Sequence, residues 1–250
     1  MFSKSFLKNI PFFKNLEEKL NNIYQRTEWV KSQLEELPRG SVLLDAGCGS
    51  QQFRRYCKHL IYKSQDFGQY DIDDKKTLGS EDGGIGISKP YNYGEIDYLG
   101  DIWSIDEVEN SFDAVLCTEV FEHIPYPAET VKEFSRLMKP GGKLIITVPS
   151  NCLRHFDPYF FYTGFSDRWF EKFLPEHQFE IDEIVPVGDY YSWLSVEIAR
   201  TALNHSILAK IVLLPAFLYY FNKKETETSV NTLCMGYYVS ATKIGHEYKQ

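Results

Sequence analysis

The 250-residue sequence has few sulfur-containing residues, with 5 cysteines and 3 methionines. The cysteines are scattered along the chain, odd in number and never arranged as a Cys-x-x-Cys pair. Disulfide-stabilised secreted domains and zinc modules both require closely spaced cysteines. No carboxylate and histidine pair has the spacing of a metal site on one helix, so we expect no metal. The first twenty residues also lack the apolar core of a signal peptide, and we expect a cytoplasmic protein.

Positive charge is in deficit. The chain has 27 Lys and Arg residues against 35 Asp and Glu residues, a net charge of −8, and a pI near 5.3. Proteins that bind nucleic acid neutralise phosphates with a basic surface. We therefore expect no nucleic-acid partner.

A long uninterrupted apolar run is missing as well. The most apolar stretch, residues 207–221, contains Lys210 and Pro215. It is shorter than the roughly 20 residues that a transmembrane helix needs. We interpret it as a buried or interface helix, with contact to a membrane surface or self-association as the alternative.

The apolar pattern predicts an α/β protein. Residues 13–36 repeat apolar side chains at helical spacing, and Pro38 and Gly40 end that helix, so we assign 1–38 to an N-terminal helical cap. Residues 39–250 form the main domain, with a glycine-rich loop at 79–94 and an apolar helical insertion near 195–225.

Seven short apolar or β-branched stretches predict the strands of one sheet. These stretches are residues 41–49, 60–67, 96–102, 112–120, 143–150, 179–187 and 233–243. Helical segments at 51–60 and 127–139 alternate with them. We therefore expect a Rossmann-like, doubly wound sheet that is mostly parallel, covered on both faces, and completed by a late antiparallel strand.

The stretch LLDAGCGSQQF, residues 43–53, joins the first predicted strand to a glycine turn. Gly47 and Gly49 allow the backbone to approach a ligand closely, with its amides directed at that ligand. A dinucleotide fingerprint requires a third glycine where this chain has Gln52, and the Gly-Lys-Ser/Thr of a phosphate loop is absent from the sequence. Asp45 would repel a pyrophosphate, so the turn favours a ligand with positive charge.

This stretch resembles motif I of the class I S-adenosylmethionine-dependent methyltransferases. The segments YKSQDF, YLGDIW, CTEVFEHI and FSRLMKPGGKLIITVP follow in the order of that family over residues 42–149. The resemblance implies S-adenosylmethionine as cofactor, with Asp66 on the ribose hydroxyls and Asp101 near the adenine. The residues implied for the cofactor site are Asp45, Gly47, Cys48, Gly49, Asp66, Phe67, Asp101, Ile102, Cys117, Thr118 and Glu119.

Two histidines are candidates for a catalytic base. His123 belongs to the Glu-His pair of the fourth motif, where a structural role is the alternative. His155 belongs to the aromatic segment NCLRHFDPYFFYTGFSDRWF, which either lines the acceptor pocket or packs as an aromatic lid or core. The other polar members of that segment are Asp157, Tyr159, Tyr162 and Arg168. Glu119 and Glu122 either tune the charge near the sulfonium or begin a helix.

The aromatic segment and QDFGQYD are similar to bacterial methyltransferases associated with surface-polysaccharide or glycan gene clusters. That likeness implies methyl transfer to a small-molecule or glycan acceptor, at oxygen. Two alternatives stay open at this point. One is a non-catalytic S-adenosylmethionine-binding or scaffold protein of the same fold. The other is a dinucleotide-dependent oxidoreductase, against which the missing third glycine argues.

Overall fold

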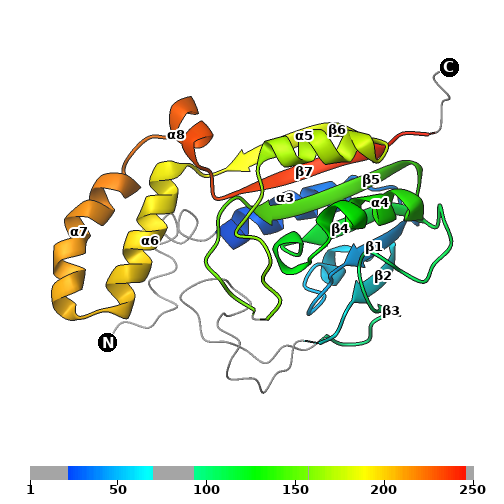
Figure 1. Cartoon of the computed structure of the whole chain (residues 1–250), viewed down its shortest axis with the longest axis horizontal. Helices are drawn as coiled ribbons and strands as arrows, with labels where there is room; N and C mark the ends of the chain where they lie inside the picture. Colours follow the sequence, from blue (N-terminus) through cyan, green and yellow to red (C-terminus); the bar gives the residue numbers. More distant parts are fainter. Residues whose placement is uncertain (1–21, 70–92, 157, 246–250) are drawn as a thin grey trace.

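The computed structural model describes residues 22–69, 93–156 and 158–245 (Figure 1). Seven strands form one sheet in the order β3-β2-β1-β4-β5-β7-β6. The strands are β1 (Val42–Ala46), β2 (Ile61–Asp66), β3 (Tyr98–Leu99), β4 (Phe112–Thr118), β5 (Met138–Pro149), β6 (Phe179–Val187) and β7 (Gly236–Lys243). Neighbours from β3 to β5 are parallel, and β7 is antiparallel to both β5 and β6. The predicted α/β class and the late antiparallel strand are confirmed.

Helices cover both faces of the sheet (Figure 1). The helices are α3 (Asn22–Glu35), α4 (Pro127–Leu137), α5 (Asp167–Glu176), α6 (Tyr190–Asn204), α7 (Ile207–Phe221) and α8 (Glu227–Thr232). Successive strand residues face opposite sides of a sheet. Accordingly, Leu43 packs in the core under α3, whereas Leu44 packs in the core under α4 and α5. The apolar run of β1 is thus buried on both faces, whereas the edge strand β6 has exposed residues along it.

Three predicted elements are wrong in extent. The fifth strand, predicted at 143–150, begins at Met138 and includes the Pro-Gly-Gly segment predicted as a turn. The segment 51–60 forms only a short 3₁₀ turn, η1 (Arg54–Tyr56), instead of a helix. Gln51 has a φ of 57°, a left-handed conformation that an α-helix does not accept. The third strand is limited to two residues, because Gly100 has a φ of 146° and turns the chain directly after it.

The predicted helical cap and loop lie partly outside the described residues. Of the cap, the structure describes α3, which packs on the sheet through Val30 and Leu34. Of the glycine-rich loop at 79–94, only the last two positions are described. The division of the chain at residue 38 therefore stays a prediction.

The apolar insertion near 195–225 is a hairpin of α6 and α7 between β6 and β7 (Figure 1). Asp189 caps α6 by accepting from the Ser192 amide, and Ser206 caps α7 by accepting from the Ala209 amide. One face of α7 is exposed, so residues 207–221 are not a fully buried helix, and the interface helix that was the other interpretation stays a prediction. In the described part of the chain, no helix has the length and apolar character needed to cross a membrane.

Candidate active site

The glycine turn after β1 is held by the end of β2. The Gly47 amide donates to Gln65 Oε1 at 3.1 Å, and the Gly49 amide donates to Asp66 Oδ2 at 2.9 Å. Both glycines have positive φ, 70° for Gly47 and 48° for Gly49. A Cβ at position 47 would lie 2.8 Å from Val120 Cγ1. The turn therefore requires glycine for its conformation and for its close approach to the segment after β4.

Replacing Gly47 by Ala is expected to lower the free energy of unfolding by about 2 kcal/mol or more, from left-handed strain and overpacking. Chemical denaturation measures the loss. Adding Val120→Ala to the Gly47→Ala variant should restore the part of the lost stability that comes from the contact between positions 47 and 120, because it removes both clashing methyl groups. If the changes in the free energy of unfolding caused by Gly47→Ala and Val120→Ala simply add, the two positions do not clash and the explanation is wrong.

Asp66 ends β2 and connects two turns. Its buried carboxylate accepts from the Gly49 amide and, at 3.0 Å, from the Gly68 amide. Burial raises the pKa of Asp66, and these hydrogen bonds oppose the shift. An ionised carboxylate can accept about four hydrogen bonds, so Asp66 keeps acceptor capacity for ligand hydroxyls.

Asp45 is buried in β1 rather than exposed on the turn. Its Oδ2 accepts from the Tyr62 hydroxyl at 2.6 Å. Burial, and then the charge of Asp66, raises the pKa of Asp45 to about 7, against the hydrogen bond from Tyr62. A positive ligand nearby would favour the ionised form and lower this pKa.

Binding of S-adenosylmethionine at pH 7 is therefore expected to release a fraction of a proton from Asp45. Because the unliganded pKa is about 7, the affinity should rise as the pH increases toward 7, where Asp45 ionises. Calorimetry in buffers of different ionisation enthalpy measures the release. Asp45→Asn should abolish it, and S-adenosylhomocysteine, which lacks the sulfonium charge, should reduce it. Equal release by the Asn variant would exclude Asp45 as the source.

Cys48, between the two glycines, is buried. Burial and the charges of Asp45 and Asp66 raise the pKa of its thiol, so it stays protonated at neutral pH. A protonated thiol is a poor nucleophile. Cys48 therefore contributes its backbone, whose amide donates to the Gln65 carbonyl at 2.9 Å.

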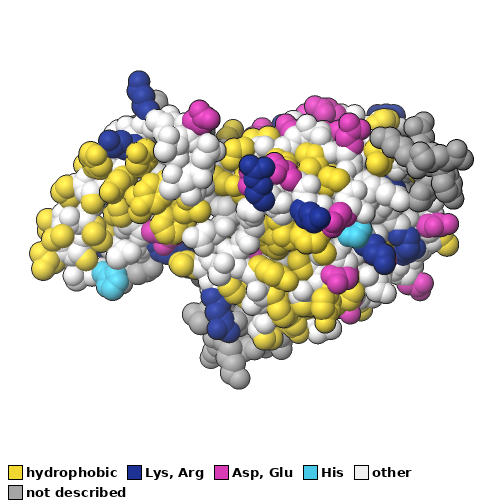
Figure 2. Space-filling model, turned by 45° about the horizontal axis from the view of Figure 1, so that its top comes forward, with side chains coloured by type: hydrophobic (Ala, Val, Ile, Leu, Met, Phe, Trp, Pro, Cys, Tyr) yellow, Lys and Arg dark blue, Asp and Glu magenta, His cyan; other side chains and the backbone are white. Residues whose placement is uncertain are grey.

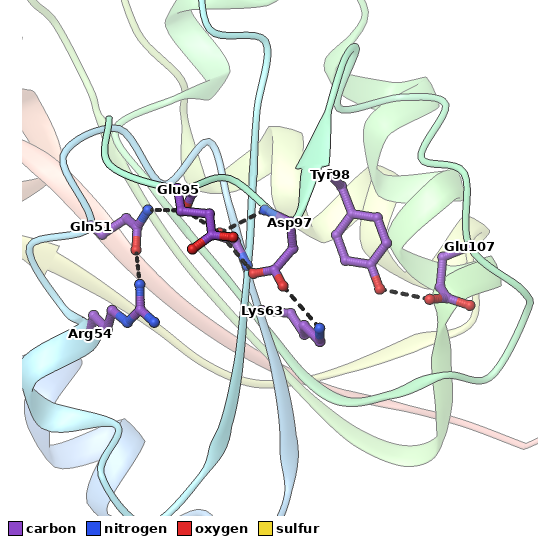
Figure 3. A network of polar contacts seen from close by, with 8 residues as sticks. Gln51, Arg54, Lys63, Glu95, Asp97, Tyr98 and Glu107 are labelled. Atoms are coloured by element: carbon purple, nitrogen blue, oxygen red, sulfur yellow. Dashed lines mark hydrogen bonds and ion pairs between the residues drawn. The ribbon is translucent and has the colours of Figure 1, made fainter. Parts of the chain in front are cut away.

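A polar network beside the glycine turn was missed by the sequence reasoning (Figure 3). Gln51 donates to the carbonyls of Tyr93 and Glu95, at 2.8 and 2.7 Å, and accepts from Arg54. Asp97 accepts from the Ser64 amide and hydroxyl, both at 2.9 Å. These bonds fix the segment before β3 next to the turn. The signal in the sequence was Gln51 itself, a side chain with two donors and an acceptor that stands two residues after Gly49.

The end of β3 separates its two predicted site residues. Gly100 is bonded to β2 through its amide, which donates to the Asp66 carbonyl at 3.0 Å. Asp101 follows with an exposed side chain, and Ile102 is buried in the core under α4 and α5. Phe67, after β2, packs edge-on against Tyr159 at a ring-centroid distance of 4.8 Å.

The end of β4 is joined to α3. Glu119 has a φ of 53°, and its Oε2 lies 2.9 Å from Arg26 Nη1 of α3. Its Oε1 accepts from Thr147 Oγ1 at 3.0 Å. Cys117 is fully buried, and Thr118 is half-buried. Arg26 thus balances the charge of Glu119, and the sequence did not indicate that α3 reaches this site.

Three titratable side chains meet beyond β4. Glu122, His123 and His155 offer ligand atoms within 4.8 Å of one another, the one group in the described ranges that could hold a metal ion. Glu122 is only 1% exposed, and burial, then Glu119, raises its pKa. The two imidazole rings stand edge-on with centroids 4.6 Å apart. The expected absence of a metal stays a prediction.

Both histidines have the tautomer of a proton acceptor. Nδ1 of His123 lies 2.7 Å from the Tyr159 carbonyl, and Nδ1 of His155 lies 2.7 Å from the Leu153 carbonyl. A carbonyl only accepts, so each Nδ1 bears the proton and each Nε2 has the lone pair. Burial, then His155, lowers the pKa of His123 to about 4, and burial lowers the pKa of His155. Both rings are neutral at pH 7.

The aromatic segment is divided between the site and the core. Phe156 and Phe160 pack around the two histidine rings. Phe165 and Phe170 belong to the core under α5. Among the polar members, Tyr159 donates to Gln69 and Tyr162 donates to the Pro125 carbonyl, whereas exposed Arg168 pairs with Glu171 away from the site. Asp157 lies outside the described residues.

These contacts define a class of protein. A mostly parallel sheet brings a glycine turn, a ribose-type carboxylate and an aromatic segment to the carboxyl edge of its strands, where α/β proteins bind nucleoside cofactors. The buried acids and the missing third glycine suit a positively charged nucleoside. The site therefore fits S-adenosylmethionine.

The chain belongs to the methyltransferase-domain family, whose model matches residues 15–183, more than half of the chain. A ubiquinone biosynthesis O-methyltransferase from Hahella chejuensis is 27% identical over 62% of this chain and 61% of its own length. The matches to three such relatives span 59–66% of the relatives' length. The predicted class of S-adenosylmethionine-dependent methyltransferases is confirmed.

Solved structures agree in fold. Phosphoethanolamine N-methyltransferase 2 from Haemonchus contortus, in complex with S-adenosyl-L-methionine, superposes with a TM-score of 0.53 and 16% identity, over 98% of this chain and 61% of that chain. The cyclase SpnF superposes with a TM-score of 0.51 and 19% identity, over 86% and 81%. At these identities the likeness concerns the fold, and the acceptor must be argued from the site.

Proposed function

We propose that the chain transfers the methyl group of S-adenosylmethionine to an oxygen atom of a small-molecule or glycan acceptor. The observation that carries the proposal is the neutral His155, with Nδ1–H held by the Leu153 carbonyl and Nε2 available as a proton acceptor. A hydroxyl acceptor benefits from such a base, because its proton must leave as the new bond to carbon forms.

The cofactor side of the proposal rests on the turns after β1 and β2. The bound donor supplies a methyl carbon activated by a sulfonium. Asp66 would accept from the ribose hydroxyls. The amides of Gly47, Cys48 and Gly49 donate to Gln65 and Asp66 instead of pointing at a ligand, so the turn would contribute close backbone approach to the donor. The proposed cofactor residues are those predicted from the sequence except Ile102, which packs in the core, and Asp45 would act through its charge.

The acceptor side rests on the aromatic segment. His155, Phe156 and Phe160 surround His123, and Tyr159 packs against Phe67. Flat rings beside a base suit the face of a sugar or of an aromatic ring. Relatives named ubiquinone biosynthesis O-methyltransferases support an oxygen acceptor, and a glycan acceptor is the alternative from the sequence likeness.

Incubation with trideuteromethyl-labelled S-adenosylmethionine and two acceptor panels, catechols and free or lipid-linked glycans, tests the proposal. Mass spectrometry should find the labelled methyl group on an acceptor hydroxyl, with unchanged yield in the presence of EDTA. Label on nitrogen or carbon would contradict oxygen transfer. Binding of the donor by calorimetry without label in either panel would favour the non-catalytic alternative.

A further inference from the structure

The outward face of α7 is apolar along its whole length. Its exposed residues recur at intervals of three and four, so they share one side of the helix. These residues, each 41–78% exposed, are Ile207, Leu208, Ile211, Val212, Leu214 and Leu218. Figure 2 shows hydrophobic side chains gathered over the hairpin that projects from the sheet. An exposed apolar surface of this kind marks an interaction site.

The hairpin is built to present this face. The opposite side of α7 packs on α6, where Tyr220 stacks on Tyr191 at a centroid distance of 6.2 Å. Helix caps at Asp189 and Ser206 fix where the two helices begin. The exposed face is therefore a consequence of ordered packing.

The charge of the surrounding residues indicates which partner the exposed face of α7 binds. Residues 198–224 contain no Asp or Glu, in a chain of net charge −8, although Glu197 and Glu225 flank the stretch and Glu197 pairs with Arg200 at 3.3 Å. The same stretch contains Arg200, Lys210, Lys223 and Lys224, of which the three lysines are exposed. Lys223 lies over the Tyr219 ring at 4.5 Å, at the end of the apolar face. Basic side chains along an apolar helix suit a membrane surface with anionic lipids.

A second copy of the chain fits this face less well. Two apolar faces brought together would also bring two copies of the exposed Lys210 together, and α7 itself has no acidic side chain to neutralise them. A lipid surface accepts both features, because lysine stems lie along the apolar surface and their ammonium groups reach the headgroups.

We propose that the exposed face of α7 binds the surface of a membrane containing anionic lipids. The helix lies in the headgroup region without crossing the bilayer. The inference concerns binding alone and stands whether or not the acceptor is methylated at oxygen.

Topology gives this binding a consequence. Val187, the last residue of β6, and Pro149, the last residue of β5, both pair with Gly236, so α6 leaves the sheet at its carboxyl edge. The glycine turn and the segment with His155 are at the same edge. A membrane-bound hairpin would thus hold the catalytic edge near the bilayer.

Flotation of the full chain with phosphatidylcholine vesicles, with and without phosphatidylserine, tests the proposal. Binding should be at least tenfold stronger to the anionic vesicles and should weaken with salt. The double change Ile211→Glu and Val212→Glu should reduce binding at least tenfold, and Lys223→Glu with Lys224→Glu should remove the preference for anionic lipid. Both pairs are exposed, so the fold and donor binding should be retained.

The matched control is Val108→Glu, an exposed apolar position outside the hairpin at 71% exposure. It should leave flotation unchanged. Equal loss in this control, or no flotation with anionic vesicles at low salt, would overturn the proposal. A stable dimer by light scattering that Ile211→Glu dissociates, without vesicle binding, would assign the face to a second copy instead.

Discussion

Replacing Asp66 by Asn is expected to weaken S-adenosylmethionine binding about a hundredfold. The carboxylate accepts from the amides of Gly49 and Gly68, so it both shapes the glycine turn and faces the proposed ribose position. An amide side chain has one acceptor oxygen and cannot replace both charged hydrogen bonds. Each such bond contributes about 1.5–3 kcal/mol, and a factor of ten corresponds to about 1.4 kcal/mol. Calorimetric titration measures the loss.

The matched control is Asp182→Asn on β6. Asp182 also accepts charged and neutral hydrogen bonds, from Lys143 and Thr242, but it lies on the edge strand β6, which four strands separate from β2. It should leave the affinity unchanged, while both variants keep the wild-type circular dichroism spectrum. Unchanged affinity in folded Asp66→Asn would show that the ribose does not bind at the end of β2.

The strand framework could be predicted because burial on both faces leaves a strong signal. Leu43 and Leu44 point to opposite sides of β1, and both sides are covered, so the strand has to be continuously apolar. The glycines after it are required by positive φ and close contact, which is also visible in the residue types.

Long-range polar contacts could not be predicted from spacing. Arg26 in α3 and Glu119 after β4 are distant in the sequence, and neither has a neighbour pattern that distinguishes it from a surface charge. The pair forms because α3 packs on the sheet face beside β4 and β5. The sequence therefore indicated Glu119 as a site residue without indicating the cation that balances it.

The exposed face of α7 shows a second limit. Composition indicates that residues 207–221 are apolar, but burial depends on whether another element is available to cover them. In the described structure α6 covers one side and leaves Ile211 and Val212 exposed. The sequence left a buried helix and an interface helix open, and the packing of the hairpin excludes only the fully buried one.

The meeting of the two predicted bases leads to the last prediction. Replacing His155 by Ala is expected to lower kcat about a hundredfold or more, the usual contribution of a general base, without changing donor affinity. His155 has the tautomer and the neutral ring that a base requires. His177→Ala, at the end of α5, is the matched control and should leave kcat unchanged.

The pH profile separates His155 from His123. Burial lowers the pKa of both, so wild-type kcat should fall only at pH values below about 6.5, the ordinary value for histidine, where the acting ring becomes protonated. If His155 is the base, His155→Ala removes this acid limb of the pH profile. His123→Ala then lowers kcat because the ring that packs against His155 is lost, but the acid limb is retained. The reverse pattern would make His123 the base and His155 its positioning residue, because the two rings are in contact and only the proton acceptor determines the titration.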